Sequence, residues 1–131
     1  MKSLKNRVVA LTGASSGIGQ ALAVELAKRG AHLSLSDVDE VGLARIKEQC
    51  EALGASVFVQ VVDVASKEAL EAWAEATSNH FGVVHAIINN AGIAVHGTIE
   101  ELPDEVFERV MQVNFWGVVH GTRAFLPYLK R

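Results

Sequence analysis

A glycine-rich turn near the amino terminus constrains the fold of this chain more than any other feature. The apolar run 8–11 leads into Thr12-Gly13-Ala14-Ser15-Ser16-Gly17-Ile18-Gly19, and apolar residues at helical spacing follow it. A strand, a glycine turn and a helix in this order form the arrangement that holds a dinucleotide pyrophosphate. The N–H groups and positive dipole end of the helix favour anions there. The alternative is a tight strand-to-helix turn without a ligand.

Each glycine of this turn has its own expected task. Gly13 takes a positive φ, Gly17 lets the backbone approach phosphates, and Gly19 lets the helix pack closely on the strand. No Lys-Ser or Lys-Thr pair closes the motif. The turn is therefore not the phosphate loop of nucleoside triphosphatases.

Composition narrows the class of protein. The chain has 131 residues, which is one domain's worth, and its 12 basic and 15 acidic side chains leave a net charge of −3 without a basic stripe for nucleic acid. Its single cysteine, Cys50, excludes an internal disulfide. Apolar runs are too short for a secretory leader or a membrane-spanning helix. We expect a cytoplasmic protein with no nucleic-acid or membrane partner.

Apolar patterning alternates between strand and helix along the whole chain. The helices end at glycines, Ser66 is the expected N-cap of the third, and the fourth extends from about 103 to 130. Strands are expected at 7–12, 32–36, 56–62 and 84–89.

This alternation predicts an α/β fold, a Rossmann-type parallel sheet with helices on both faces. Right-handed crossovers place the first two helices on one face. If the strand order then reverses, it becomes 3-2-1-4, and a crevice opens at the carboxyl ends of strands one and four. The glycine turn and Asn89-Asn90-Ala91-Gly92 would meet in this crevice.

Two carboxylates follow neighbouring strands. Asp37 ends the second strand, where it can accept hydrogen bonds from ribose hydroxyls and would repel a 2′-phosphate, so NAD is favoured over NADP. It could instead cap the next helix. Asp63 ends the third strand, where it can accept from an adenine amino group, although aspartate is also common in turns.

The fourth helix is apolar on all sides. Such a helix is buried on more than one side, against the sheet and against further chain or a second subunit. Asn114 lies within it among apolar neighbours. It is either a core asparagine with satisfied partners, or a functional amide; it can also kink the helix by bonding its backbone.

Together these residues resemble the short-chain dehydrogenase/reductase family, in its non-extended branch. The resemblance covers essentially the whole chain and rests on the turn 12–19, Asp37, Asp63-Val64, Asn89-Asn90-Ala91-Gly92 and Asn114. It implies a hydride-transferring enzyme that acts on a small-molecule alcohol or ketone and prefers NAD over NADP, with a homo-oligomer formed through the fourth helix.

The resemblance also implies a role for individual residues. Asn114 corresponds to the catalytic asparagine, which positions a water in a proton relay. The implied cofactor contacts are the pyrophosphate at Gly13, Ser15, Ser16, Gly17, Ile18 and Gly19, the adenosine ribose at Asp37, the adenine at Asp63 and Val64, and the nicotinamide-side ribose at Asn90, Ala91 and Gly92.

One departure qualifies these expectations. The family's catalytic Ser and Tyr-x-x-x-Lys come after the fourth helix, and the only tyrosine here, Tyr128, is followed by Leu129, Lys130 and Arg131. We therefore expect residues 1–131 to be an amino-terminal cofactor-binding half without the catalytic half, and inactive alone. The histidines show neither a metal-binding spacing nor a catalytic triad.

Three hypotheses follow. The chain is the cofactor half of an NAD-dependent alcohol dehydrogenase or carbonyl reductase, a nucleotide-binding module without turnover, or an assembly module. The last would use the fourth helix and an exposed edge of strand four formed by Val84, Ala86, Ile87 and Ile88.

Overall fold

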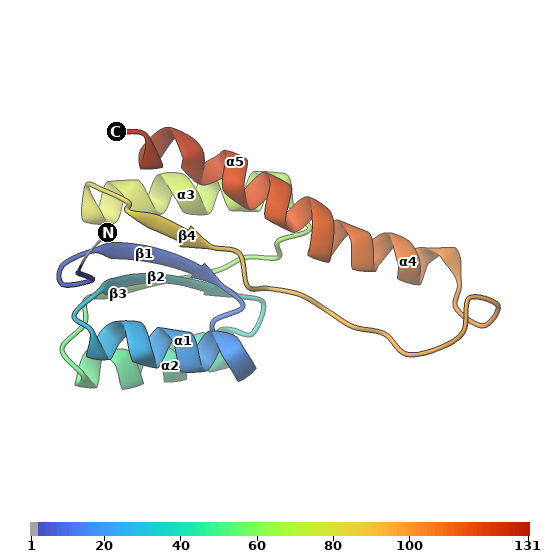
Figure 1. Ribbon diagram of the computed structural model, residues 1–131, viewed down its shortest axis with the longest axis horizontal. Helices are drawn as coiled ribbons and strands as arrows, with labels where there is room; N and C mark the ends of the chain where they lie inside the picture. The colour runs from blue at the N-terminus through green and yellow to red at the C-terminus, as the bar shows by residue number, and fades with distance from the viewer. Residues whose placement is uncertain (1–2) are drawn as a thin grey trace.

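A four-stranded parallel sheet forms the centre of the molecule. A computed structural model describes residues 3–131. The strands β1 (Val8–Thr12), β2 (His32–Asp37), β3 (Val57–Val61) and β4 (Ala86–Ile88) lie in the order β3-β2-β1-β4 (Figure 1). All three pairings are parallel. The predicted strand order is confirmed.

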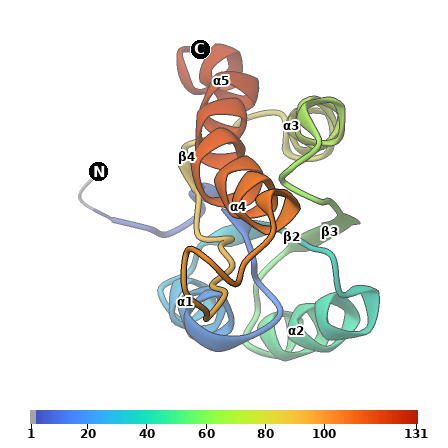
Figure 2. The same ribbon diagram turned by 90° about the vertical axis from the view of Figure 1, so that its right-hand side faces the viewer.

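Helices cover both faces of the sheet. α1 (Gly17–Lys28) and α2 (Glu40–Ala52) lie on one face, and α3 (Lys67–Phe81) and α5 (Gly117–Leu129) lie on the other (Figures 1 and 2). This division into three layers is the arrangement that alternating strands and helices predict.

The sheet separates two apolar clusters, because successive side chains of a strand point to opposite faces. Val9 and Leu11 of β1 pack with α1 and α2, and Cys50 of α2 belongs to the same cluster. Ala10 faces the other way, toward Trp73 and Phe125. Burial raises the pKa of the Cys50 thiol to about 11, so it remains protonated at neutral pH.

Both ends of α3 match the expected signals. The Ser66 side chain accepts a hydrogen bond from the Ala69 amide at 3.2 Å and caps the first turn. Gly82 follows the last turn with φ +79°, a left-handed conformation that glycine adopts without steric cost.

The fourth predicted helix is divided by a wider turn. α4 (Asp104–Met111) leads into a π-helical turn, η1 (Gln112–Trp116), and then into α5. A π turn closes i→i+5 hydrogen bonds, and the patterning of apolar residues does not reveal it. α4 extends beyond the sheet (Figure 1) and contains no buried residue. Large apolar side chains stay exposed along this segment: Phe107, Met111, Phe115, Trp116, Val118 and Leu126.

β4 lies at one edge of the described sheet, and it is shorter than predicted. Ala86, Ile87 and Ile88 are half-buried. Val84 precedes the strand and is only 3% exposed, which contradicts its expected place on an open apolar edge. Within residues 3–131, no helix has both the length and the apolar composition needed to cross a bilayer.

Candidate functional site

The glycine turn joins β1 to α1 in the predicted conformation. Gly13 and Gly17 both have positive φ, at +65° and +56°. A Cβ at Gly19 would lie 1.8 Å from the Gly13 carbonyl oxygen, so only glycine allows this approach of helix and strand. By contrast, a Cβ at Gly17 would meet nothing within 4 Å. The backbone at Gly17 is therefore open to a ligand.

Hydrogen bonds connect this turn to the loop that follows β4. The Thr12 hydroxyl accepts from the backbone amides of Asn90 and Ala91, each at 2.9 Å. In return, the Asn90 side-chain amide donates to the carbonyl oxygens of Thr12 and Gly13, each at 3.2 Å. The glycine turn and the loop after β4, which were predicted to meet in one crevice, are thus hydrogen-bonded to each other. Asn89, the first residue of that loop, instead donates to the Thr122 hydroxyl at 3.2 Å.

Asp37 ends β2 and faces the glycine turn. Its Oδ2 accepts from the Ser15 amide at 3.1 Å, and its Oδ1 accepts from the Asp39 amide at 3.1 Å. The N-cap of α2 is Asp39, whose side chain accepts from the Gly42 amide. The alternative that Asp37 caps this helix is therefore wrong. Each Asp37 oxygen keeps a lone pair for a further donor.

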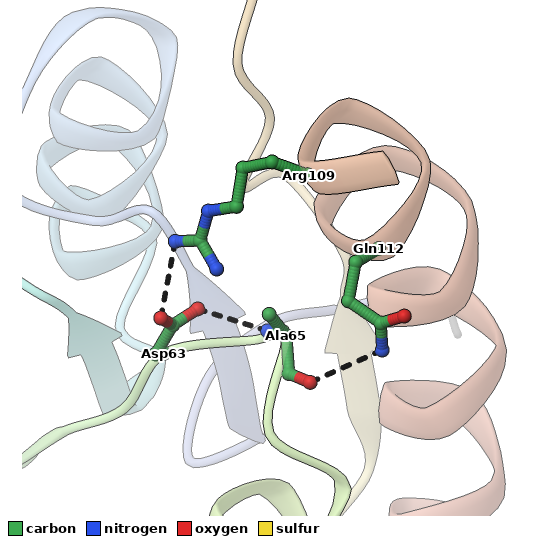
Figure 3. A network of polar contacts seen from close by, with 4 residues as sticks. All are labelled: Asp63, Ala65, Arg109 and Gln112. Carbon is green, nitrogen blue, oxygen red and sulfur yellow. Dashed lines mark hydrogen bonds and ion pairs between the residues drawn. The ribbon is translucent and has the colours of Figure 1, made fainter. Parts of the chain in front are cut away.

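Asp63 lies two residues beyond the end of β3, in the loop before α3, because the strand ends at Val61 and not at residue 62 as predicted. Its Oδ1 accepts from the Ala65 amide at 2.9 Å, as aspartates commonly do in turns. Its Oδ2 accepts from Arg109 Nη2 of α4 at 3.0 Å (Figure 3). Gln112 donates to the Ala65 carbonyl oxygen at 3.1 Å. Sequence reasoning missed both Arg109 and Gln112.

Asn114 lies in the π turn, and its side chain bonds the loop after β4. Its Oδ1 accepts from the Ile93 amide and its Nδ2 donates to the Ile93 carbonyl oxygen, each at 2.8 Å. The residue is exposed, which corrects the expectation of a buried amide. Its side chain bonds this loop and not the backbone of its own helix.

A cavity of about 190 Å³ opens where these elements meet. The predicted residues that line it come from all four carboxyl ends of the strands, and α4 and η1 supply Arg109 and Val113. The predicted lining residues are Gly13, Ser16, Asp37, Asp63, Val64, Ala91 and Gly92. The other predicted residues lie beside the cavity and do not line it: Ser15, Gly17, Ile18, Gly19, Asn90 and Asn114.

The single tyrosine lies elsewhere. Tyr128 is near the end of α5, beneath the Arg131 guanidinium at 5.2 Å. It lines a separate hollow between α3 and α5 with His120 and Arg123. Figure 1 shows this end of α5 at the opposite side of the molecule from α4. Tyr128 therefore does not contribute to the cavity.

A comparison with protein families agrees with this geometry. The model described as short chain dehydrogenase matches residues 7–131. The chain belongs to the short chain dehydrogenase family. The resemblance inferred from the motifs is thereby confirmed.

Individual members of the family cover almost all of the chain. SadH of Mycobacterium tuberculosis, named as an oxidoreductase, is 49% identical over 129 residues, which are 98% of this chain and 47% of SadH. A short chain dehydrogenase/reductase from Burkholderia phymatum, solved in complex with NAD, superposes with a TM-score of 0.94 at 39% identity, over 98% of this chain and 46% of that chain.

A third family member was solved with a different cofactor. The alcohol dehydrogenase of Thermococcus sibiricus, complexed with 5-hydroxy-NADP, gives a TM-score of 0.93 at 35% identity and covers 97% of this chain and 55% of that chain. This chain thus spans about half the length of these relatives. Because family members were solved with both NAD and an NADP derivative, membership alone does not select between the two cofactors.

Proposed function

We propose that this chain is the cofactor-binding part of an NAD-dependent oxidoreductase that acts on alcohol or carbonyl groups. The observation that supports this most is the cavity at the carboxyl ends of the strands, which is lined by the glycine turn, Asp37 and Asp63. This is the position where open parallel sheets bind dinucleotides. When bound, the nicotinamide supplies the hydride chemistry, and the protein contributes binding and orientation.

The residues present fit the adenosine and pyrophosphate portion of the cofactor. The open space at Gly17 and the amino-terminal end of α1 fit the negative pyrophosphate. The cavity is smaller than the ~300 Å³ at which sites for whole drug-sized ligands begin, so by itself it would take one end of a dinucleotide. We assign that end to adenosine.

The carboxylate of Asp37 supports NAD as the preferred cofactor. Both of its oxygens are oriented by backbone donors and retain lone pairs for the two ribose hydroxyls. A 2′-phosphate would bring a second negative charge against this carboxylate, and like charges in contact cost several kcal/mol. Among the described lining residues the only Lys or Arg is Arg109, which is paired with Asp63.

The test measures cofactor affinity in the protein at its natural length. Asp37→Ala should weaken NADH binding and reduce the preference for NADH over NADPH by about tenfold or more, because it removes charged hydrogen bonds and charge repulsion. Glu40→Gln removes a neighbouring carboxylate of α2 and should leave this preference unchanged. An unchanged preference in Asp37→Ala would contradict the assignment.

The remaining predictions about the protein stay proposals. We propose that residues 1–131 alone bind the dinucleotide weakly and without turnover, supported by the position of Tyr128 outside the cavity. We also propose a homo-oligomer in which a second copy covers the exposed apolar face of 103–130, supported by Phe115 and Trp116, which are 48% and 42% exposed. Sedimentation at micromolar concentration that shows only monomer would exclude it.

The buried thiol of Cys50 supports a cytoplasmic location, which fractionation can test.

A further inference from the structure

Arg109 connects α4 to the base of the candidate cofactor cavity. Its Nη2 lies 3.0 Å from Asp63 Oδ2, although the two residues are 46 positions apart in the chain. Figure 3 shows the guanidinium extending from α4 across to the loop that follows β3. No other Lys or Arg lines this cavity within residues 3–131.

The arginine completes the orientation of the Asp63 carboxylate. One carboxylate oxygen accepts from the Ala65 amide and the other from Arg109, so donors on two sides fix its plane. A carboxylate oxygen accepts about two hydrogen bonds, so lone pairs remain for a ligand. The cavity is lined by the same Asp63.

A second contact reinforces this arrangement one turn further along. Gln112 lies three residues after Arg109 and donates to the Ala65 carbonyl oxygen at 3.1 Å. Residues at i and i+3 share a helix face, and here both grip the loop 63–65. Asn114 bonds the loop after β4 through Ile93. The segment 109–114 therefore holds the loops on both sides of the cavity.

We propose that Arg109 is a positioning residue for recognition of the purine base. By fixing the Asp63 carboxylate, it directs the free lone pairs toward the 6-amino group of adenine, which donates hydrogen bonds. A purine with a 6-oxo group presents an acceptor at this position, and two facing acceptors repel. The arginine therefore increases selectivity for adenine over hypoxanthine. This inference rests on the proposed function, because it assigns the adenosine end to this cavity.

The experiment compares NADH with its hypoxanthine analogue by fluorescence titration of the protein at its natural length. The unsubstituted protein should bind NADH about tenfold more tightly than the analogue, the value of one charge-assisted hydrogen bond. Arg109→Ala should reduce this ratio to within about threefold of unity, and Arg109→Lys, which keeps the charge but loses the planar fork, should retain an intermediate ratio.

Two further variants separate this role from simple stabilisation. Arg29→Ala breaks a similarly exposed pair, Arg29–Glu25 at 2.9 Å at the carboxyl end of α1, and should leave the ratio unchanged. Asp63→Asn should remove the preference for NADH, because an amide also donates. In that background Arg109→Ala should not change the ratio further, as expected when one residue acts through the other.

The outcomes distinguish the inference from the proposed function. If Arg109→Ala binds NADH and the analogue with an unchanged ratio, Arg109 is only structural and the inference is wrong. If it loses affinity for NADPH alone, Arg109 contacts a phosphate, and the inference is again wrong while the proposed site remains. If the unsubstituted protein binds no NADH, the proposed function is wrong and this inference with it.

Discussion

The side-chain amide of Asn114 forms two hydrogen bonds with the backbone of a single residue, Ile93, and both are 2.8 Å long. The amide thereby links the π turn to the loop after β4. The oxygen can accept one more hydrogen bond and the nitrogen can donate one more. This remaining capacity is compatible with the water-positioning role that the family resemblance implies for Asn114.

We expect Asn114→Ala to weaken this link. Two hydrogen bonds contribute a net ~1–3 kcal/mol to stability. Because Asn114 is exposed, we expect a loss in unfolding free energy at the lower end of this range. Urea unfolding would measure it. Asn79→Ala is the matched control, because Asn79 is an exposed helical asparagine of α3. Equal losses in the two variants would show that the bonds to Ile93 contribute nothing.

Alanine at two glycines of the same turn should reduce stability by different amounts. In Gly19→Ala the Cβ meets the Gly13 carbonyl oxygen, which is backbone and must shift, so we expect a loss of about 3 kcal/mol or more in unfolding free energy. In Gly17→Ala the Cβ enters open space, and the positive φ should cost only ~1–2 kcal/mol.

At Gly17, NADH binding should be affected more than stability. Its Cβ would project where we place the pyrophosphate, so Gly17→Ala should weaken NADH binding more than its stability loss alone explains. Urea unfolding and NADH titration of both variants provide the two measurements. A Gly17→Ala protein with unchanged NADH affinity would argue against a ligand at this position.

His85 gives the molecule a predictable response to pH. Its Nδ1 accepts from the Val8 amide at 2.9 Å, which requires an unprotonated nitrogen. Desolvation, followed by the charge of Arg7, lowers the pKa of His85 below its ordinary 6.5. The unfolded chain therefore binds this proton at a higher pH than the folded protein. The resulting stability is present above pH 6.5 and is lost as the pH falls through 6.5 toward the lower folded pKa.

The variant His85→Asn separates this effect from general acid sensitivity. Asparagine retains an acceptor for the Val8 amide but does not titrate. Between pH 7 and pH 5, the unsubstituted protein should lose more unfolding free energy than His85→Asn. Denaturant titrations across this range test the difference, and parallel pH profiles would show that His85 has no part in it.

The sequence was sufficient to predict the sheet and the carboxylates at its edge. Strand order follows from alternation and handedness, and Asp37 follows from its distance to the glycine turn. These signals are local, or they depend on rules that apply to all parallel sheets. The exact strand ends differed, most at β4, where pairing with β1 covers only Ala86–Ile88.

The side-chain contacts that sequence reasoning missed join elements far apart in the chain. Arg109 has the pattern of an ordinary charged residue on a helix surface, and only the tertiary structure brings it to Asp63. The buried hydroxyl of Ser34, bonded to Trp73 Nε1 at 2.9 Å and to Thr77 Oγ1 at 2.7 Å, is equally invisible in a strand pattern. No periodicity distinguishes a hydroxyl with a buried partner from one in solvent.

Because α4 contains no buried residue, the two sides of the cavity differ in how firmly they are held by packing. The glycine turn and the loop after β4 follow directly from strands of the sheet, whereas α4 projects past the sheet (Figure 1). The side chains of Arg109 and Asp63 are 48% and 44% exposed, so water can compete for the contact between them. We therefore expect local fluctuations to be larger on the α4 side of the cavity than on the side built on the buried strands.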